Sequence, residues 1–295
     1  MDRDTAIVRR FNRSYTQRIG ALEESFLGMG LPLGAARLLY EIGARPGTVG
    51  ELRARLGLDS GYLSRLLRRL QDEALVTVVA DPADRRRRQV RLTATGRRRW
   101  RKLEDRSQQQ ARILIDPLRP SQRERLVTAL ATADLLVRAA TVVPEPVPAG
   151  GQLAQQAVGH YFAELQQRFS DGFEAAEQSA HDVEALSPPG VVFVVAVSDG
   201  EPVACGGVQT IGPGTAEIKR MWVHPEWRGA GLGSRLLSRL EDCAGELDRQ
   251  RIRLDTNDTL TEAIAMYRRA GYREIERYND NPYARLWFEK RLPRR

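Results

Sequence analysis

Residues 224–234 read His-Pro-Glu-Trp-Arg-Gly-Ala-Gly-Leu-Gly-Ser and stand between an apolar strand pattern and a helical pattern. Glycines at a strand-to-helix turn let successive backbone N–H groups approach a diphosphate, and the helix N-terminus adds about half a positive charge. The spacing Arg-x-x-Gly-x-Gly, which starts at Arg228, lacks the Gly-Lys-Ser/Thr of a P-loop. The preceding strand lies in a series of hairpins, which argues against the dinucleotide-binding fingerprint. The turn therefore has a form that can approach a diphosphate, although glycines alone do not establish such a site.

Strand and helix patterns surround this loop on both sides. Before it, apolar runs joined by glycine-containing turns predict three antiparallel strands, at 191–197, 202–211 and 216–223. After it come a leucine-rich helical pattern, a strand ending in a polar residue at 252–257, and a helix at 263–272. The final stretch, residues 278–290, predicts a last strand and a loop.

Together these patterns resemble the GCN5-related N-acetyltransferase (GNAT) superfamily over residues 190–292, although residues 152–186 read as helical and supply no obvious first strand. The resemblance implies an α/β domain with a mixed, largely antiparallel sheet, acetyl-CoA as the cofactor and an amine as the acetyl acceptor. It also implies that the backbone of Met221 and Val223 pairs with the pantetheine arm. Asn257 would hydrogen-bond the cofactor, and its alternative role is to cap its own loop. The implied cofactor-binding residues are Met221, Trp222, Val223, Arg228, Gly229, Ala230, Gly231, Leu232, Gly233, Ser234 and Asn257.

Acetyl transfer needs a neutral amine, attack on a thioester carbonyl and protonation of the leaving thiolate. Glu217 lies on the strand before the loop and is the candidate proton acceptor, directly or through water. Regular alternation would place it on the same side as Lys219, Met221 and Val223. Tyr267 is the candidate proton donor to the sulfur. The alternatives are a surface carboxylate for Glu217 and a packing role for Tyr267.

Charge separates the two halves of the chain. Residues 1–143 carry 28 basic and 16 acidic side chains, whereas residues 144–295 carry 18 basic and 22 acidic ones. This asymmetry predicts a polyanionic partner for the first half. Residues 141–151 contain three prolines and predict an extended, semi-rigid connector. We therefore expect domains at 1–140 and 152–295, joined by a linker at 141–151.

The basic half contains the pattern of a recognition helix. An apolar stripe from Ile7 to Phe26 predicts a long first helix, and short helical patterns follow at 34–43 and 49–56. The next helix, with Ser60 as its cap, buries four leucines and turns small residues, then arginines, outward. A helix that enters a DNA major groove needs that order. The alternative is a solvated helix face.

A basic wing follows this helix. Residues 76–80 and 89–92 predict two strands around a turn that carries Asp84 and four consecutive arginines. Adjacent arginines repel one another weakly at a surface and gain more beside a phosphate backbone or in a narrow minor groove.

The order of these elements resembles the MarR family of winged-helix transcriptional regulators over residues 30–140, with the family's wing motif matched by Asp84, Arg85, Arg86, Val90, Leu92 and Thr93. The resemblance implies that Arg86 enters the minor groove, braced by Asp84, and that residues 60–71 lie in the major groove. It also implies a homodimer held by the first helix and by residues 97–115 and 121–140, on a pseudo-palindromic operator in double-stranded DNA. Ala74 departs from the family, which usually has glycine there. The candidate DNA-binding residues are Ser60, Gly61, Ser64, Arg65, Arg68, Asp84, Arg85, Arg86, Arg87 and Arg88.

The remaining composition excludes several classes of protein. The two cysteines and three histidines show no metal-ligand spacing, so we expect no metal site. The longest apolar run, Val191–Val197, is too short to span a membrane, and the N-terminus has no apolar signal core. We expect a cytoplasmic protein with no membrane partner.

The expected fold class is a multidomain α+β protein, with a mostly helical winged helix-turn-helix domain followed by a GNAT domain. The leading hypothesis is a bifunctional DNA-binding regulator and acetyl-CoA-dependent N-acetyltransferase that acts on a small amine or a protein lysine. One alternative is a regulator whose GNAT half senses acetyl-CoA or an amine without turnover. Another is an enzyme whose winged-helix half serves only as a dimerisation scaffold.

Overall fold

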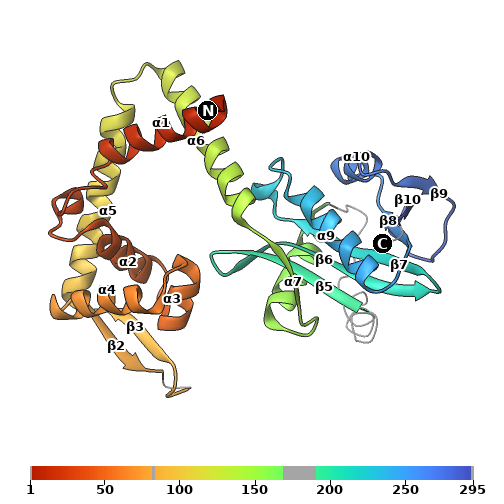
Figure 1. Ribbon diagram of the computed structural model, residues 1–295, viewed down its shortest axis with the longest axis horizontal. Helices are drawn as coiled ribbons and strands as arrows, with labels where there is room; N and C mark the ends of the chain where they lie inside the picture. The colour runs from red at the N-terminus through yellow and green to blue at the C-terminus, as the bar shows by residue number, and fades with distance from the viewer. Residues whose placement is uncertain (1, 82–83, 169–190, 294–295) are drawn as a thin grey trace. The chain divides into compact units, whose positions relative to one another are not determined.

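The computed structural model describes residues 2–81, 84–168 and 191–293, and the chain forms two units, Met1–Ala129 and Leu130–Arg295 (Figure 1). The expected fold class is confirmed: the first unit is mostly helical, and the second is built on a mixed, largely antiparallel sheet. The division falls inside helix α6 (Pro120–Thr141), ahead of the proline-rich segment. It falls there because Ala139, in the last turn of α6, is buried in the main core of the second unit.

The first unit consists of five helices, the first part of α6, a short 3-10 helix and a small sheet. These elements are α1 (Arg3–Arg18), η1 (Phe26–Gly28), α2 (Leu33–Ala44), β1 (Gly47–Thr48), α3 (Val49–Leu56), α4 (Ser60–Asp72), β2 (Val76–Ala80), β3 (Arg88–Leu92) and α5 (Ala94–Ile115). The strand order is β1-β3-β2, and both pairings are antiparallel. The expected strand-turn-strand wing is therefore β2 and β3.

Local sequence explains where helices α3 and α4 begin and end. Thr48 and Glu51 form a reciprocal capping box at the start of α3, and Gly57 ends that helix with a φ of 60°. The N-cap of α4 is Asp59, not the expected Ser60, because the Asp59 side chain accepts a hydrogen bond from the Tyr62 amide at 2.8 Å. Ala74 has a φ of 53°, which explains why glycine suits this position better.

The first helix differs from its expected form. The apolar stripe predicted one long helix, but α1 ends at Arg18 and Phe26 lies in η1. Residues 3–18 are all described, and none of them is buried. Phe11 and Tyr15 stack with ring centroids 5.4 Å apart while remaining 46% and 40% exposed. In a single copy of the chain, the apolar residues of α1 therefore form an exposed helix face.

In the described residues, the second unit contains a seven-stranded sheet in the order β4-β5-β6-β7-β8-β10-β9, and β7 and β8 are the only parallel pair among these strands. Its elements are β4 (Pro144–Val147), α7 (Gln152–Arg168), β5 (Val191–Ser198), β6 (Glu201–Gly212), β7 (Thr215–Val223), η2 (Pro225–Trp227), α9 (Leu232–Glu246), β8 (Arg251–Thr256), α10 (Thr261–Arg269), β9 (Arg273–Ile275) and β10 (Leu286–Arg291). Among the described helices, none is both long and apolar enough to cross a membrane.

Alternating residues of β5 show which helix covers each face of this sheet. Val194 and Ala196 belong to the core that includes α9 and α10, whereas Phe193 and Val195 belong to a second core that includes α7. Successive strand residues point to opposite faces, so α7 covers one face while α9 and α10 cover the other.

The proline-rich segment takes part in the sheet. The expected connector at 141–151 includes strand β4, whose residues pair with β5 from Pro144↔Ala196 to Val147↔Phe193. Proline lacks a backbone N–H, so such a strand suits only the edge of a sheet, where β4 lies. Part of the predicted helical stretch at 152–186 is α7, and residues 169–186 lie outside the described residues.

A bulge in β7 overturns the expectation of regular alternation. Cys205 pairs with Trp222 and Gly207 with Lys219, so Arg220 and Met221 together oppose Gly206, and Arg220 has a φ of 55°. Ala216 and Ile218 face α9 before the bulge, whereas Met221 and Val223 do so after it. Glu217 and Met221 therefore lie on opposite faces of the sheet, and the prediction that they share a side is wrong.

Candidate active site

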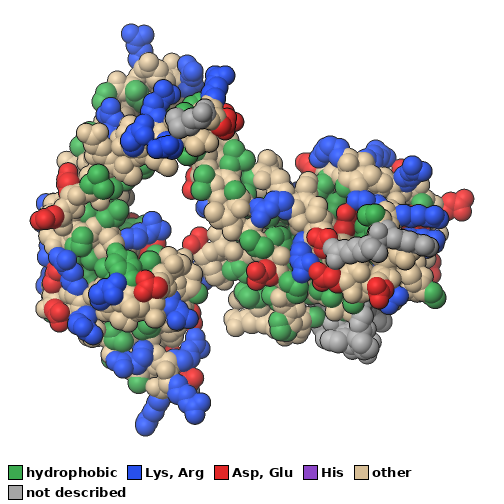
Figure 2. Space-filling model, in the orientation of Figure 1, with side chains coloured by type: hydrophobic (Ala, Val, Ile, Leu, Met, Phe, Trp, Pro, Cys, Tyr) green, Lys and Arg blue, Asp and Glu red, His purple; other side chains and the backbone are tan. Residues whose placement is uncertain are grey.

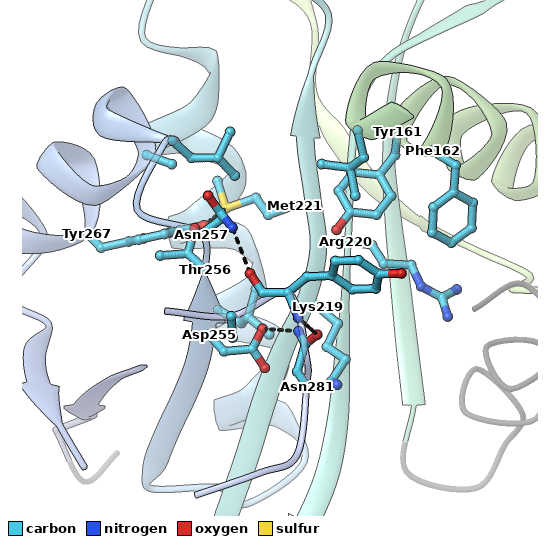
Figure 3. Close-up of a pocket in the computed structure, with 16 residues that line it drawn as sticks. Tyr161, Phe162, Lys219, Arg220, Met221, Asp255, Thr256, Asn257, Tyr267 and Asn281 are labelled. Carbon is cyan, nitrogen blue, oxygen red and sulfur yellow. Dashed lines mark hydrogen bonds between the residues drawn. The ribbon is translucent and has the colours of Figure 1, made fainter. Parts of the chain in front are cut away.

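The strands β7 and β8 separate early, and two cavities lie where they part. Their pairing ends at Glu217↔Arg253. The first, which we name the loop cavity, has a volume of about 550 Å³ and is bounded by the end of β7, the loop at 228–234, α7 and α10. The second, which we name the strand cavity, has a volume of about 130 Å³ and lies between β7, β8 and the loop at 281–284 (Figure 3).

The two cavities adjoin. Six residues line both of them: Tyr161, Leu165, Met221, Leu260, Ala263 and Tyr267. Because the shared lining includes residues from both helical layers, the gap between β7 and β8 connects the two faces of the sheet. Groups bound in the two cavities would meet beside Met221 and Tyr267.

The glycine-rich turn has the backbone geometry of an anion-binding loop. Gly229 and Gly231 have φ values of 80° and 77°, a region that residues with a Cβ rarely adopt. In the described structure, no side chain caps the N-terminus of α9, which begins directly after Gly231. The predicted loop residues that line the loop cavity are Arg228, Gly229, Gly231, Gly233 and Ser234.

The other two predicted loop residues face the protein interior. Leu232 is buried and Ala230 packs against the same core. Their side chains are therefore not placed to contact a ligand.

Arg228 is held by a carboxylate that the sequence analysis missed. Its Nε donates to the Val223 carbonyl at 3.0 Å, and its Nη2 lies 2.6 and 2.5 Å from the two carboxylate oxygens of Glu164 in α7. Trp222 Nε1 and Arg168 Nε also lie within 2.7 and 2.8 Å of Glu164. Burial opposes ionisation of Glu164, but hydrogen bonds from Arg228 and Trp222 outweigh it and lower its pKa. Glu164 is therefore an anion in the wall of the loop cavity.

Two further arginines line this cavity. Arg168 ends α7, and Arg269 ends α10 on the opposite wall. No motif in the sequence marks Glu164, Arg168 or Arg269, because helix packing alone brings α7 and α10 to the loop.

The edge of β7 beside the loop cavity is open. Beyond Glu217 the described part of β8 offers β7 no further pairing. Met221, Trp222 and Val223 line the cavity at this edge. An extended ligand can add to it as a strand does.

Tyr267, the candidate proton donor, lies in the wall shared by both cavities. Its hydroxyl lies 3.9 Å from Met221 Sδ, and its ring packs against Tyr272 and Phe288. Burial, with a smaller contribution from the charge of Asp255, raises the pKa of Tyr267. The hydroxyl therefore keeps its proton at neutral pH.

Glu217 lies apart from Tyr267. Its side chain is 3% exposed and accepts hydrogen bonds from Gln209 at 2.6 Å, Tyr278 at 2.8 Å and Asn279 at 3.0 Å. Lys219 Nζ is 3.5 Å from its carboxylate. Glu217 is not among the described residues that line either cavity. The side chains of Gln209, Tyr278 and Asn279 surround its carboxylate instead.

Asn257 behaves as a loop-holding residue. Its amide nitrogen donates to the Tyr283 carbonyl at 2.8 Å, and its oxygen accepts from the amide and hydroxyl of Thr259 at 3.0 and 2.7 Å. It lines the strand cavity and not the loop cavity. This geometry matches the capping alternative.

The candidate DNA-binding residues form an exposed basic surface in the first unit. Figure 2 shows Lys and Arg side chains gathered where β2 and β3 meet. The exposed candidates on α4 and the wing are Ser60, Gly61, Ser64, Arg65, Arg68, Asp84, Arg85, Arg86, Arg87 and Arg88. The Asp84 carboxylate accepts a hydrogen bond from the Arg86 amide at 3.0 Å. Arg87 instead pairs with Glu51 of α3 at 2.7 Å. Residues 82 and 83 lie outside the described residues.

The chain matches two family models. The acetyltransferase (GNAT) family model matches residues 159–272, and the MarR family model matches residues 29–87. Over 143 residues the chain is 34% identical to a protein of Azospirillum brasilense described as IAA acetyltransferase; the match covers 47% of this chain and 92% of that protein. It is also 33% identical over 121 residues to an uncharacterised N-acetyltransferase of Schizosaccharomyces pombe, covering 39% of this chain and 74% of the relative.

A solved MarR transcriptional regulator of Methanosarcina mazei is similar to the first part of the chain. It shares 22% identity, with a TM-score of 0.38, and the match covers 44% of this chain and 94% of that one. The family models confirm both resemblances that the sequence analysis identified.

Proposed function

Because the chain belongs to the GNAT family of acetyltransferases and carries a MarR-family region, it is an acyltransferase, and we propose that it transfers an acetyl group from acetyl-CoA to a primary amine. The observation that supports this proposal most directly is the junction of the two cavities at Met221 and Tyr267. One cavity is built for a ligand with a diphosphate and an extended arm, and the other is a small polar chamber beside it.

The residues of the loop cavity fit an acyl-CoA. The amides of residues 229–234 and the N-terminus of α9 would hold the pyrophosphate, as backbone N–H groups at a helix start do. Arg269 supplies a further positive charge. The open edge of β7 at Met221 and Val223 would pair with the pantetheine arm. When bound, acetyl-CoA supplies a thioester carbonyl.

Arg228 has a positioning role in this proposal. Its guanidinium is engaged by Glu164 and by the Val223 carbonyl. These contacts tie the start of the loop to the end of β7 and to α7. The residue therefore shapes the phosphate-binding loop and gives it positive charge, part of which Glu164 balances.

The transfer forms a bond between the acceptor nitrogen and the acetyl carbon and breaks the bond between that carbon and sulfur. An acceptor that enters as an ammonium ion loses two protons. Tyr267, whose raised pKa keeps it protonated, donates its proton to the sulfur and recovers one from the new amide nitrogen. The other proton leaves to solvent.

The DNA-binding role rests on the first unit. Exposed arginines of α4 and of the wing would contact a major groove and its flanking minor groove. The exposed apolar face of α1, together with exposed Ile113 of α5 and Val127 of α6, would be covered in a homodimer. Such a dimer would read a pseudo-palindromic site.

Three measurements test the two activities. Calorimetry with acetyl-CoA tests binding, and release of free thiol with a panel of primary amines tests transfer. Binding without thiol release from any amine would instead support a regulator that only senses the ligand. A gel-shift titration on the DNA upstream of the protein's own coding sequence should show affinity that falls steeply with salt. Absence of that salt dependence would reject DNA binding.

A further inference from the structure

The strand cavity contains three charged side chains, and two of them have charged or aromatic partners. Lys219 lies 3.5 Å from Glu217, and the Arg220 guanidinium stacks over the Phe162 ring at 5.9 Å. The third is Asp255. Its two carboxylate oxygens accept hydrogen bonds from the neutral side-chain amides of Asn279 at 2.6 Å and Asn281 at 2.7 Å. Among the described residues, no Lys or Arg forms an ion pair with Asp255.

Asp255 also occupies a particular place in the fold. It is two residues beyond Arg253, the last residue of β8 that pairs with β7. It therefore stands where the strands have just parted. Figure 3 shows Asp255 and Thr256 at the end of β8, and Asn257 just beyond it, across from Lys219, Arg220 and Met221 of β7. Tyr267 lines the same cavity.

The two asparagines fix the orientation of this carboxylate. Asn279 donates to Glu217 as well as to Asp255, and its own side-chain oxygen accepts from Trp287 Nε1 at 2.8 Å. The Asn281 oxygen accepts from the Tyr283 amide at 3.1 Å. Both side chains are thus held, and both present only N–H groups to Asp255. Neutral donors stabilise the anion without balancing its charge, so Asp255 remains an anionic group in the cavity wall, although Lys219 and Arg220 also line this cavity.

We infer that Asp255 binds the ammonium group of the acetyl acceptor, so that the acceptor is a small cationic primary amine. This inference rests on the proposed acetyl transfer. An ammonium group supplies the positive charge that the asparagines do not, and its three N–H groups match the carboxylate lone pairs. An acceptor with a carboxylate or phosphate at this point would bring two like charges together in a half-buried site.

The location suits the chemistry that follows. Asp255 accepts one proton from the bound ammonium, which leaves a neutral nitrogen with a free electron pair and a protonated carboxyl. The nitrogen then faces the junction with the loop cavity, where Met221 and Tyr267 lie. After transfer the proton on Asp255 is released to solvent, so Asp255 returns to its anionic form.

The test compares Asp255→Asn with Asp258→Asn. Asp258 is exposed, lies three residues after Asp255 and is not among the described residues lining either cavity. Its variant therefore removes the same negative charge outside the proposed site. The acceptor probes are n-pentylamine and phenethylamine, with 3-phenylpropionate as the anionic match. Free-thiol release gives kcat and KM for each probe, and calorimetry gives the acetyl-CoA affinity.

We expect thiol release with at least one amine, and 3-phenylpropionate, which has no nitrogen to acetylate, should not inhibit that release as a competitor. Asp255→Asn should lower kcat/KM for that amine by about 30-fold or more, as loss of one partner of a desolvated charge pair does. Its acetyl-CoA affinity should stay within about twofold of the parent, which shows that the variant is folded, and Asp258→Asn should match the parent.

Three results would overturn the inference. The first is a kcat/KM of Asp255→Asn within about threefold of the parent value. The second is a larger loss of kcat/KM in Glu217→Gln than in Asp255→Asn. The third is a parent protein that binds acetyl-CoA but acetylates no amine of the panel. Failure of the parent protein to bind acetyl-CoA would be a different result, because it rejects the proposed function itself.

Discussion

Glu164 of α7 holds Arg228 of the glycine-rich loop, with one guanidinium nitrogen 2.6 and 2.5 Å from the two carboxylate oxygens. The pair joins two segments 64 positions apart in the sequence. It also places a carboxylate in the wall of a cavity that we expect to receive a diphosphate. These two consequences act in opposite directions, since the pair stabilises the fold while its anion opposes an anionic ligand.

Glu164→Gln should therefore separate stability from affinity. We expect the free energy of unfolding to fall by about 1–3 kcal/mol, because Arg228 and Trp222 lose a charged acceptor. We expect acetyl-CoA to bind several-fold more tightly, because one negative charge leaves the cavity. Thermal denaturation and calorimetry measure the two effects. The matched control is Glu226→Gln, an exposed carboxylate on η2, which should change neither.

The stability effect should depend on pH. The pKa of Glu164 is lower in the folded protein than in the unfolded chain, where it is about 4.3. The contribution of the Glu164–Arg228 pair to the free energy of unfolding is then fully present above about pH 5. It is lost as the pH falls through the pKa of Glu164 in the folded protein. The melting temperatures of the parent and of Glu164→Gln should converge in acid. A difference that stays constant down to about pH 3 would contradict this account.

Tyr267→Phe tests proton donation to the sulfur. The variant keeps the ring that packs against Phe288 and removes only the hydroxyl. We expect kcat to fall by about 100-fold, the lower range for loss of a general acid, with acetyl-CoA affinity and melting temperature little changed. An unchanged kcat would assign Tyr267 to packing. Because burial raises the tyrosine pKa, the parent enzyme should not lose this group up to about pH 10.

Arg86→Ala tests the wing. Its guanidinium is exposed, and the described contact of this residue is the hydrogen bond from its backbone amide to Asp84. We expect weaker DNA binding and a slope of log affinity against log salt that is smaller by about 1 per site. Acetyl transfer should be unaffected. Arg273→Ala, an exposed arginine on β9 in the second unit, is the charge-matched control and should leave the slope unchanged.

Phe11→Glu tests the homodimer. Phe11 lies in the exposed apolar face of α1, where a new carboxylate would be desolvated in a dimer and solvated in a monomer. We expect light scattering to report half the parent mass and DNA affinity to fall with it. Arg13→Glu changes charge on the same helix away from Phe11 and should remain dimeric. A parent protein that is monomeric at micromolar concentration would refute the proposal.

Arg235→Ala tests the contact between the end of α6 and the first turn of α9. Arg235, in the first turn of α9, donates to the backbone carbonyls of Ala139 and Val142 at the end of α6. We expect a loss of about 1–3 kcal/mol in unfolding free energy and faster hydrogen exchange at residues 138–142. Bound acetyl-CoA should slow that exchange in the parent, because it orders the same turn of α9. Arg239→Ala, one turn later and paired with the exposed Glu246, is the control.

The sequence by itself determined the elements whose signals are local. The glycine spacing at 228–234 specified a turn with left-handed φ values, and the leucines of α4 specified which side of that helix is exposed. Each pattern is contained within one helix or one turn, so neighbouring residues are enough to specify it. For the same reason both families could be identified from short motifs.

Only the tertiary structure decided which side chains meet at the candidate active site. The bulge at Arg220 depends on how β7 registers against β6, and one extra residue moves Glu217 to the face opposite Met221. Glu164, Asp255 and Arg269 reach the cavities from separate elements. No sequence spacing encodes their proximity, because packing of α7 and α10 on the two faces of one sheet creates it.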